Sequence, residues 1–198
     1  MINILYLHGF LSRSSSKKGA LLKDSLSAET MRVPVIPFQA MDCIEKRIKK
    51  MGDNVCLVGH SLGGFYATIL SQKLNIPAVL LNPSVFPSES PILKQGGIVK
   101  SFDIVPSGWG ISNAVTELKS LESGAIEINK PQNILVLVQT GDELANHEDT
   151  IEYYAHSEHI TIEGGSHRFE NLKDWLPEIC LFFNQHYKLQ SGTGHIKP

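Results

Sequence analysis

The sequence predicts an α/β fold: a doubly wound, mainly parallel sheet of six strands with a small cap insertion. Short, continuously apolar runs alternate with helical patterns along the chain. Runs of this kind are typical of parallel strands that are covered by helices on both faces. The chain has 198 residues, of which 42% are hydrophobic and 19% charged, so it is long and apolar enough for one domain with a sizeable core.

The expected elements follow one another in a regular rhythm. The strands are expected at residues 2–7, 31–36, 54–58, 78–81, 134–138 and 159–162. The helices are expected at residues 17–28, 41–51, 62–74, 114–121, 149–156 and 171–187. Residues 83–112, rich in Pro, Ser and Gly, interrupt this rhythm as the cap insertion. Residues 1–188 then form a single domain, and residues 189–198 a loose polar tail.

Charge and cysteine content exclude several classes of protein. The net charge of −2 gives no basic excess for nucleic acid, and no charge block points to a membrane surface. No apolar run reaches membrane-spanning length, and no basic leader precedes the first strand. The cysteines, Cys43, Cys56 and Cys180, lack metal-ligand spacing and do not form a disulfide framework. We expect a cytoplasmic protein without metal or cofactor; its oligomeric state is not determined by the sequence.

A serine stands at the junction of the third expected strand and the helix that follows it. The apolar run ends in Gly59-His60-Ser61-Leu62-Gly63, and the helical pattern begins at once. A sharp strand-to-helix turn lifts the serine hydroxyl above the sheet edge, where it is presented as a nucleophile. Gly59 and Gly63 are needed because side chains there would collide with the neighbouring strand and helix. The alternative is a small-residue turn required only for packing; the helix after it favours catalysis.

A serine nucleophile needs a base and an acid that orients the base. Two loops at strand carboxyl ends supply candidates: Gln139-Thr140-Gly141-Asp142-Glu143 and Glu163-Gly164-Gly165-Ser166-His167. We predict His167 as the base, because it lies in a glycine loop after the last strand. Asp142, directly after the glycine turn, is the predicted acid, with Glu143 and Asp149 as rivals.

The oxyanion hole needs two backbone donors. The N–H of Leu62 is the first, and the N–H of Phe10, in the loop after the first strand, is the second. Gly9 lets that loop approach the substrate, while His8 and His60 are expected to brace the loops. The basic loop from Ser12 to Lys18 fits either a phosphate group of a large thioester or, more simply, a solvated loop that caps the next helix.

These motifs together resemble the α/β-hydrolase superfamily and, more closely, the small bacterial YqiA-like esterases. The similarity covers nearly the whole chain. It is carried by residues 5–10, the serine turn with Tyr66-Ala67-Thr68, residues 77–83, 139–143 and 163–167. The resemblance implies a minimal α/β-hydrolase fold, a triad of Ser61, Asp142 and His167, and activity on small acyl esters or acyl thioesters.

The expected function is therefore hydrolysis of small carboxylic esters through an acyl-enzyme. An acyl thioesterase is the near alternative, and a non-catalytic binding protein with a hydrolase fold is the distant one. The cap insertion is expected either to wall the acyl site or only to cover the adjacent helix and sheet. Its apolar side chains are Val85, Phe86, Ile92, Leu93, Ile98, Phe102 and Trp109.

Overall fold

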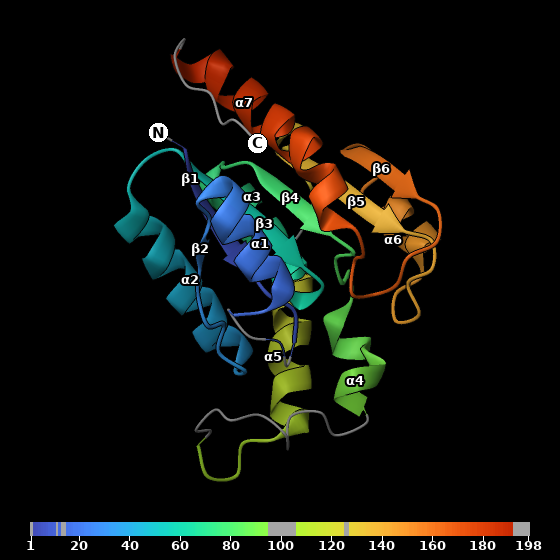
Figure 1. Cartoon of the computed structure of the whole chain (residues 1–198). Coiled ribbons are helices and arrows are strands. Elements are labelled where there is room, and N and C mark those ends of the chain that lie inside the picture. Colours follow the sequence, from blue (N-terminus) through green and yellow to red (C-terminus); the bar gives the residue numbers. More distant parts are fainter. Residues whose placement is uncertain (1, 11, 13–14, 95–105, 125–126, 192–198) are drawn as a thin grey trace.

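The computed structural model describes residues 2–10, 12, 15–94, 106–124 and 127–191 (Figure 1). Its strands are β1 Asn3–Leu7, β2 Glu29–Thr30, β3 Val55–His60, β4 Ala78–Leu81, β5 Ile134–Gln139 and β6 Glu158–Ile162. They form one six-stranded sheet in the order β2-β1-β3-β4-β5-β6, and all neighbouring strands are parallel. The doubly wound parallel sheet predicted from the sequence is confirmed.

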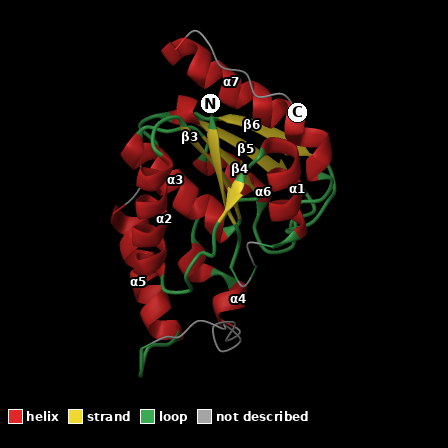
Figure 2. Ribbon diagram, turned by 60° about the vertical axis from the view of Figure 1, so that its left-hand side comes forward, coloured by secondary structure: helices red, strands yellow, loops and turns green. Residues whose placement is uncertain are grey.

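Helices cover the sheet on both sides. They are α1 Lys17–Leu26, α2 Pro37–Met51, α3 Leu62–Leu74, α4 Pro91–Lys94, α5 Ile111–Gly124, α6 His147–Tyr153 and α7 Leu176–Ser191. Three 3₁₀ turns, η1 Pro87–Glu89, η3 Pro131–Asn133 and η4 Leu172–Trp175, complete the described structure. Figure 2 shows the sheet between α2, α3 and α5 on its left and α1 on the other side.

The four central strands, β1, β3, β4 and β5, each contribute alternate side chains to two separate cores. In β1, Leu5 and Leu7 join the core beneath α2, α3 and α5, whereas Ile4 and Tyr6 join the core beneath α1 and α7. Burial on both faces explains why the strands read as continuous apolar runs. The strands therefore have a fixed register, and their carboxyl ends meet at one edge of the sheet.

The strand expected at residues 31–36 is absent, and β2 is confined to Glu29–Thr30 just before it. Pro34 has no N–H for a ladder hydrogen bond, and Pro37 begins α2 with a proline in its first turn. The apolar side chains Val33, Val35 and Ile36 are buried all the same, in the core beneath α2. The sequence signalled burial correctly, but two prolines made the segment irregular.

Other boundaries moved by a few residues. The helix expected at 171–187 is divided into η4 and α7, and α7 continues to Ser191, into the stretch expected as a tail. Residues 192–198 lie outside the described residues. In the cap insertion, η1, α4 and the start of α5 are described, whereas residues 95–105, with Ile98 and Phe102, lie outside the description. Figure 1 places α4 and α5 beyond the carboxyl edge of the sheet.

Candidate active site

Ser61 lies between the end of β3 and the start of α3, in a backbone conformation that L residues rarely adopt. Its φ is 54° and its ψ is −121°. A Cβ on Gly59 would lie 2.5 Å from the Gly63 carbonyl oxygen, and a Cβ on Gly63 would lie 2.1 Å from the Leu7 carbonyl oxygen. Both positions need glycine because the turn is pressed against its neighbours. The strained serine is thus held by close packing of β1, β3 and α3.

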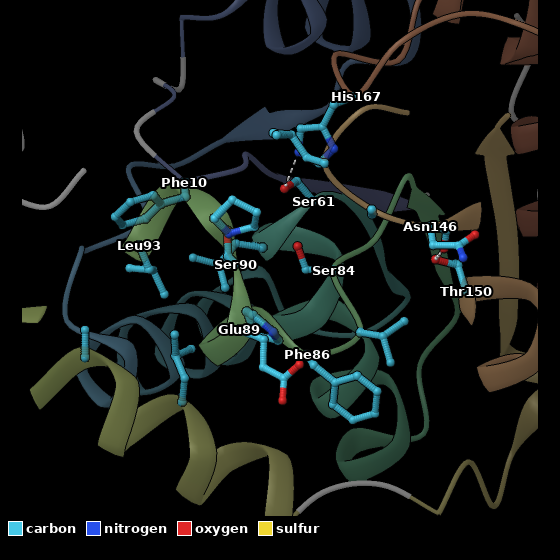
Figure 3. A pocket seen from close by; sticks show the side chains of 18 of the residues that line it. Phe10, Ser61, Ser84, Phe86, Glu89, Ser90, Leu93, Asn146, Thr150 and His167 are labelled. Atoms are coloured by element: carbon cyan, nitrogen blue, oxygen red, sulfur yellow. Dashed lines mark hydrogen bonds between the residues drawn. The ribbon is translucent and has the colours of Figure 1, made fainter. Parts of the chain in front are cut away.

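The imidazole of His167 lies between Ser61 and Asp142. Its Nε2 is 2.8 Å from Ser61 Oγ, and its Nδ1 is 2.9 Å from both carboxylate oxygens of Asp142. Figure 3 marks the hydrogen bond between His167 and Ser61 with a dashed line. An ionised carboxylate only accepts hydrogen bonds, so Nδ1 carries the proton and Nε2 is free to accept one from the serine hydroxyl. Ser61 and His167 are 7% and 9% exposed.

Asp142 is held by its own loop. Its Oδ1 accepts the N–H groups of Leu144, at 2.9 Å, and Ala145, at 3.0 Å. Burial acts to raise the pKa of Asp142, but the hydrogen bond and charge of His167, with those two N–H groups, outweigh it and lower that pKa below its ordinary value. The carboxylate is therefore ionised at neutral pH and can stabilise a charged imidazole.

The two rival acids lie elsewhere. Glu143 Oε2 accepts the backbone N–H of His167 at 2.8 Å, so it holds the loop and not the ring. That bond is the main cause that lowers the pKa of Glu143. Asp149 is on α6 and lines the pocket described below. Of the three acids, Asp142 alone has a hydrogen bond to the His167 ring.

The two predicted oxyanion donors flank the serine. Leu62 is the first residue of α3, where a backbone N–H has no partner within the helix. Phe10 follows Gly9, and a Cβ on Gly9 would lie 3.1 Å from Ser61 Cβ. Leu62 and Phe10 line the same pocket as Ser61. Their role as donors stays a prediction.

A cavity of about 210 Å³ opens beside Ser61. The described part of the insertion supplies one wall through residues between Ser84 and Leu93, and α5 supplies Ala114 and Leu118. Figure 3 shows Phe10 and Leu93 on one side of the pocket and Asn146 and Thr150 on the other. The exposed ring of Phe86 packs edge-on against Tyr153, with ring centroids 6.0 Å apart.

His8 and His60 brace the loops, as expected. His8 Nε2 accepts the Val33 N–H at 3.2 Å, so its Nδ1 donates to the Gly9 carbonyl at 2.9 Å. His60 Nε2 donates to the His167 carbonyl at 2.8 Å. Burial, with the charge of Lys18 as the next cause, lowers the pKa of His60 to about 3, so this ring is neutral and a weak proton acceptor.

The basic loop expected between Ser12 and Lys18 is partly described. Ser16 is the N-cap of α1, where its hydroxyl accepts the Gly19 N–H at 3.2 Å. The Lys18 ammonium donates to the Arg168 carbonyl. Burial, followed by the charge of Arg168, lowers the pKa of Lys18 to about 8. The described contacts agree with the capping role; residues 13 and 14 lie outside the described residues.

Two amide side chains at this edge were missed by the sequence reasoning. Asn82 directly follows the fourth strand and Gln139 ends the fifth, and both side chains hydrogen-bond to the loop that carries His167. Their positions at strand carboxyl ends were the available signal. Within the described ranges, no group of His, Cys, Asp and Glu side chains is arranged to hold a metal ion, and no helix is long and apolar enough to cross a membrane.

Comparisons with known proteins agree with this architecture. Residues 3–184 match a family described as "Uncharacterised protein family (UPF0227)". A UPF0227 protein of Citrobacter koseri is 25% identical over 188 residues, which are 90% of this chain and 97% of that protein.

Solved structures share the α/β-hydrolase fold. Est1E from Butyrivibrio proteoclasticus superposes with a TM-score of 0.67 at 18% identity, over 94% of this chain and 87% of that one. A structure reported for LipS and LipT, described as metagenome-derived lipolytic enzymes, has a TM-score of 0.67 at 15% identity, over 93% and 94% of the two chains.

Proposed function

Because this chain belongs to the family UPF0227 and aligns a serine, a histidine and an aspartate at a strained turn, we propose that it is a serine esterase of small acyl esters. The observation that carries the proposal is the continuous line of hydrogen bonds from Ser61 Oγ through His167 to Asp142. Neighbours in fold described as lipolytic enzymes support the same class of reaction. A protein that only bound ligands would not require this alignment.

The proposed reaction has two halves, acylation of Ser61 by the ester and hydrolysis of the acyl-enzyme by water. Ser61 Oγ attacks the acyl carbon while His167 Nε2 takes its proton, and the same nitrogen returns the proton to the leaving alcohol. Asp142 holds the ring in the required tautomer and stabilises the imidazolium. Water then attacks the acyl carbon while His167 Nε2 takes its proton, and the same nitrogen gives that proton to Ser61 Oγ as the bond to the acyl group breaks. The N–H groups of Phe10 and Leu62 stabilise the negative oxygen of each tetrahedral intermediate.

The acyl group is proposed to occupy the cavity beneath the insertion. Val85, Leu93 and Leu118 give that cavity an apolar wall, and Phe86 stands at its exposed side. A cavity of about 210 Å³ favours short chains over long ones. The proposed partner is thus a small-molecule acyl ester; a thioester fits the same machinery and is an outcome of the test below.

Hydrolysis of p-nitrophenyl esters from acetate to palmitate tests this proposal. We expect kcat/KM to rise with each methylene that fits, by up to about 0.8 kcal/mol of binding, and then to fall once the wall is reached. Acyl thioesters of the same chain lengths, assayed beside the esters, show whether the protein prefers an ester or a thioester substrate. A steady rise through palmitate would contradict the small pocket, and no turnover of any ester or thioester above a Ser61→Ala control would contradict the esterase.

A further inference from the structure

We propose that Asn82 and Gln139 are positioning residues that hold the His167 loop in its reactive geometry. The proposal rests on the esterase function above. Both side chains are 2% exposed, and they stand at the carboxyl ends of β4 and β5. Neither lines the substrate pocket, so any effect on the reaction would pass through the loop.

Gln139 grips the loop on both sides of the catalytic residue. Its Oε1 accepts the N–H groups of Ser166, at 3.2 Å, and Glu170, at 2.8 Å, and its Nε2 donates to the Glu170 carbonyl at 2.9 Å. A Cβ on Gly165 would lie 2.2 Å from Oε1, so the loop backbone is pressed against the amide. One side chain therefore fixes the chain before and after His167.

Asn82 ties this grip to the sheet. Its Nδ2 donates to the Ser166 carbonyl at 2.9 Å, and its Oδ1 accepts the Gln139 N–H at 2.8 Å. Its own N–H donates to the Leu137 carbonyl at 3.0 Å. The loop that carries His167 is thus fixed to the ends of both β4 and β5. Ser61 is also fixed to β4, because its N–H donates to the Leu81 carbonyl at 3.1 Å. Ser61 and the loop of His167 are therefore held by the same strand, β4.

The loop needs such support because its backbone turns repeatedly into the left-handed region and is strained at Phe169. Four residues between positions 164 and 171 have positive φ: Gly164 at 76°, Gly165 at 74°, Phe169 at 54° and Asn171 at 56°. Glycine and asparagine adopt this conformation readily, whereas phenylalanine disfavours it, so the strain lies at Phe169. A backbone of this kind persists only where its surroundings impose it. The two amides supply that constraint at the residue just before His167 and again three residues after it.

An amide is required because it donates and accepts at once. Leucine at position 139 would remove the side-chain partner of three partly buried backbone groups, the N–H of Ser166 and the N–H and carbonyl of Glu170. Glutamate would keep the two bonds to Oε1, but its other oxygen would face the Glu170 carbonyl and could donate only when protonated. The replacement of Gln139 by glutamate thus turns the grip into one that depends on pH.

The test compares Gln139→Leu and Gln139→Glu with the wild type and with Gln72→Leu as a matched control. Gln72 grips a backbone in the same manner near the opposite edge of the sheet, with Nε2 donating to the Lys130 carbonyl at 3.2 Å and Oε1 accepting the Lys130 N–H at 2.8 Å. Chemical unfolding of each variant first gives its folded fraction.

We expect Gln139→Leu to lower kcat about 100-fold, the effect of an ångström-scale misplacement, while KM stays within about twofold. For Gln139→Glu, the ratio of its kcat to that of the wild type should increase as pH is lowered, because protonation restores the lost bond. Gln72→Leu should lose stability and keep the wild-type kcat. If Gln139→Leu does not fold, the pH dependence of Gln139→Glu decides alone.

Equal kcat values for folded Gln139→Leu and Gln72→Leu would overturn the proposal, as would a pH-independent ratio for Gln139→Glu. Proton NMR separates this proposal from the proposed function. The far-downfield Nδ1 proton shared by His167 and Asp142 should be present in the wild type and displaced or lost in Gln139→Leu, whether or not any ester is cleaved. An unchanged resonance in that variant would also overturn it.

Discussion

The two edges of the sheet, at the amino and carboxyl ends of its strands, both contain residues with positive φ, but under different constraints. At the amino edge, Asn75 ends α3 with φ 56° and ψ 47°, inside the ordinary left-handed region, and its Oδ1 accepts from Asn133 Nδ2 at 3.0 Å. At the carboxyl edge, Ser61 begins the same helix with a similar φ of 54° but with ψ −121°. Asparagine tolerates the first conformation well, whereas serine adopts the second only under constraint.

Packing shows the same contrast. A Cβ on Gly52, near the amino edge, would meet nothing within 4 Å, whereas one on Gly63 would collide with the Leu7 backbone. At the amino edge, hydrogen bonds of side-chain amides hold the connections between helices and strands. At the carboxyl edge they hold the loop of His167 against β4 and β5. Strain combined with tight packing and buried titratable groups therefore distinguishes the functional edge.

The largest expected effect is on the acid at the carboxyl edge. Asp142→Asn should lower kcat by about 10⁴-fold in a folded protein, because an amide that donates to Nδ1 would favour the wrong imidazole tautomer. Glu143→Gln is the matched change one residue away. It should cost far less, because its amide oxygen can still accept the His167 N–H. Steady-state kinetics measures both, and a greater loss in Glu143→Gln would reassign the acid.

A second prediction concerns packing at the turn between β3 and α3 that carries Ser61. Gly63→Ala should destabilise the fold by roughly 3 kcal/mol or more, since its Cβ would lie 2.1 Å from a backbone oxygen that has no room to move. Gly110→Ala, at a position with nothing within 4 Å, should change stability by about 1 kcal/mol at most. Urea unfolding measures the difference. Equal stability of the two variants would contradict the tight packing of this edge.

The third prediction uses the buried ring of His60. Its pKa falls from 6.5 to about 3, so the unfolded chain binds a proton in this range that the folded chain does not. Stability therefore falls as pH decreases from about 6.5 towards 3, by at most about 1.4 kcal/mol per pH unit from this ring. In His60→Asn the decline between pH 7 and 5 should be shallower. Unfolding curves at both pH values measure this, and parallel declines would mean that His60 titrates normally.

The sequence allowed the fold to be predicted because periodicity is local. Strand and helix alternation placed β1, β3, β4, β5 and β6 within a residue or two, and α3 to the residue. The strand predicted at residues 31–36 was wrong, because an apolar pattern indicates burial and not strand pairing. Pro34 and Pro37 determine the backbone conformation there. For the site, strand-end loops indicated Ser61, Asp142 and His167.

The roles of Asn82 and Gln139 were not visible in the sequence for a physical reason. Their partners lie 84 and 31 positions away, in Ser166 and Glu170, and nothing local to either amide specifies those pairings. Only the folded sheet brings the strand ends and the loop together. The same holds for Glu143, whose hydrogen bond to the His167 backbone N–H joins residues 24 positions apart.

Covalent labelling with a fluorophosphonate tests the central claim most directly. The reagent marks a serine only where a base activates its hydroxyl and an oxyanion site stabilises the adduct. Mass spectrometry of the digested protein should place a single label on Ser61, and both Ser61→Ala and His167→Ala should remain unlabelled while folded. An unlabelled wild-type protein, or a label on another residue that persists in Ser61→Ala, would contradict the account.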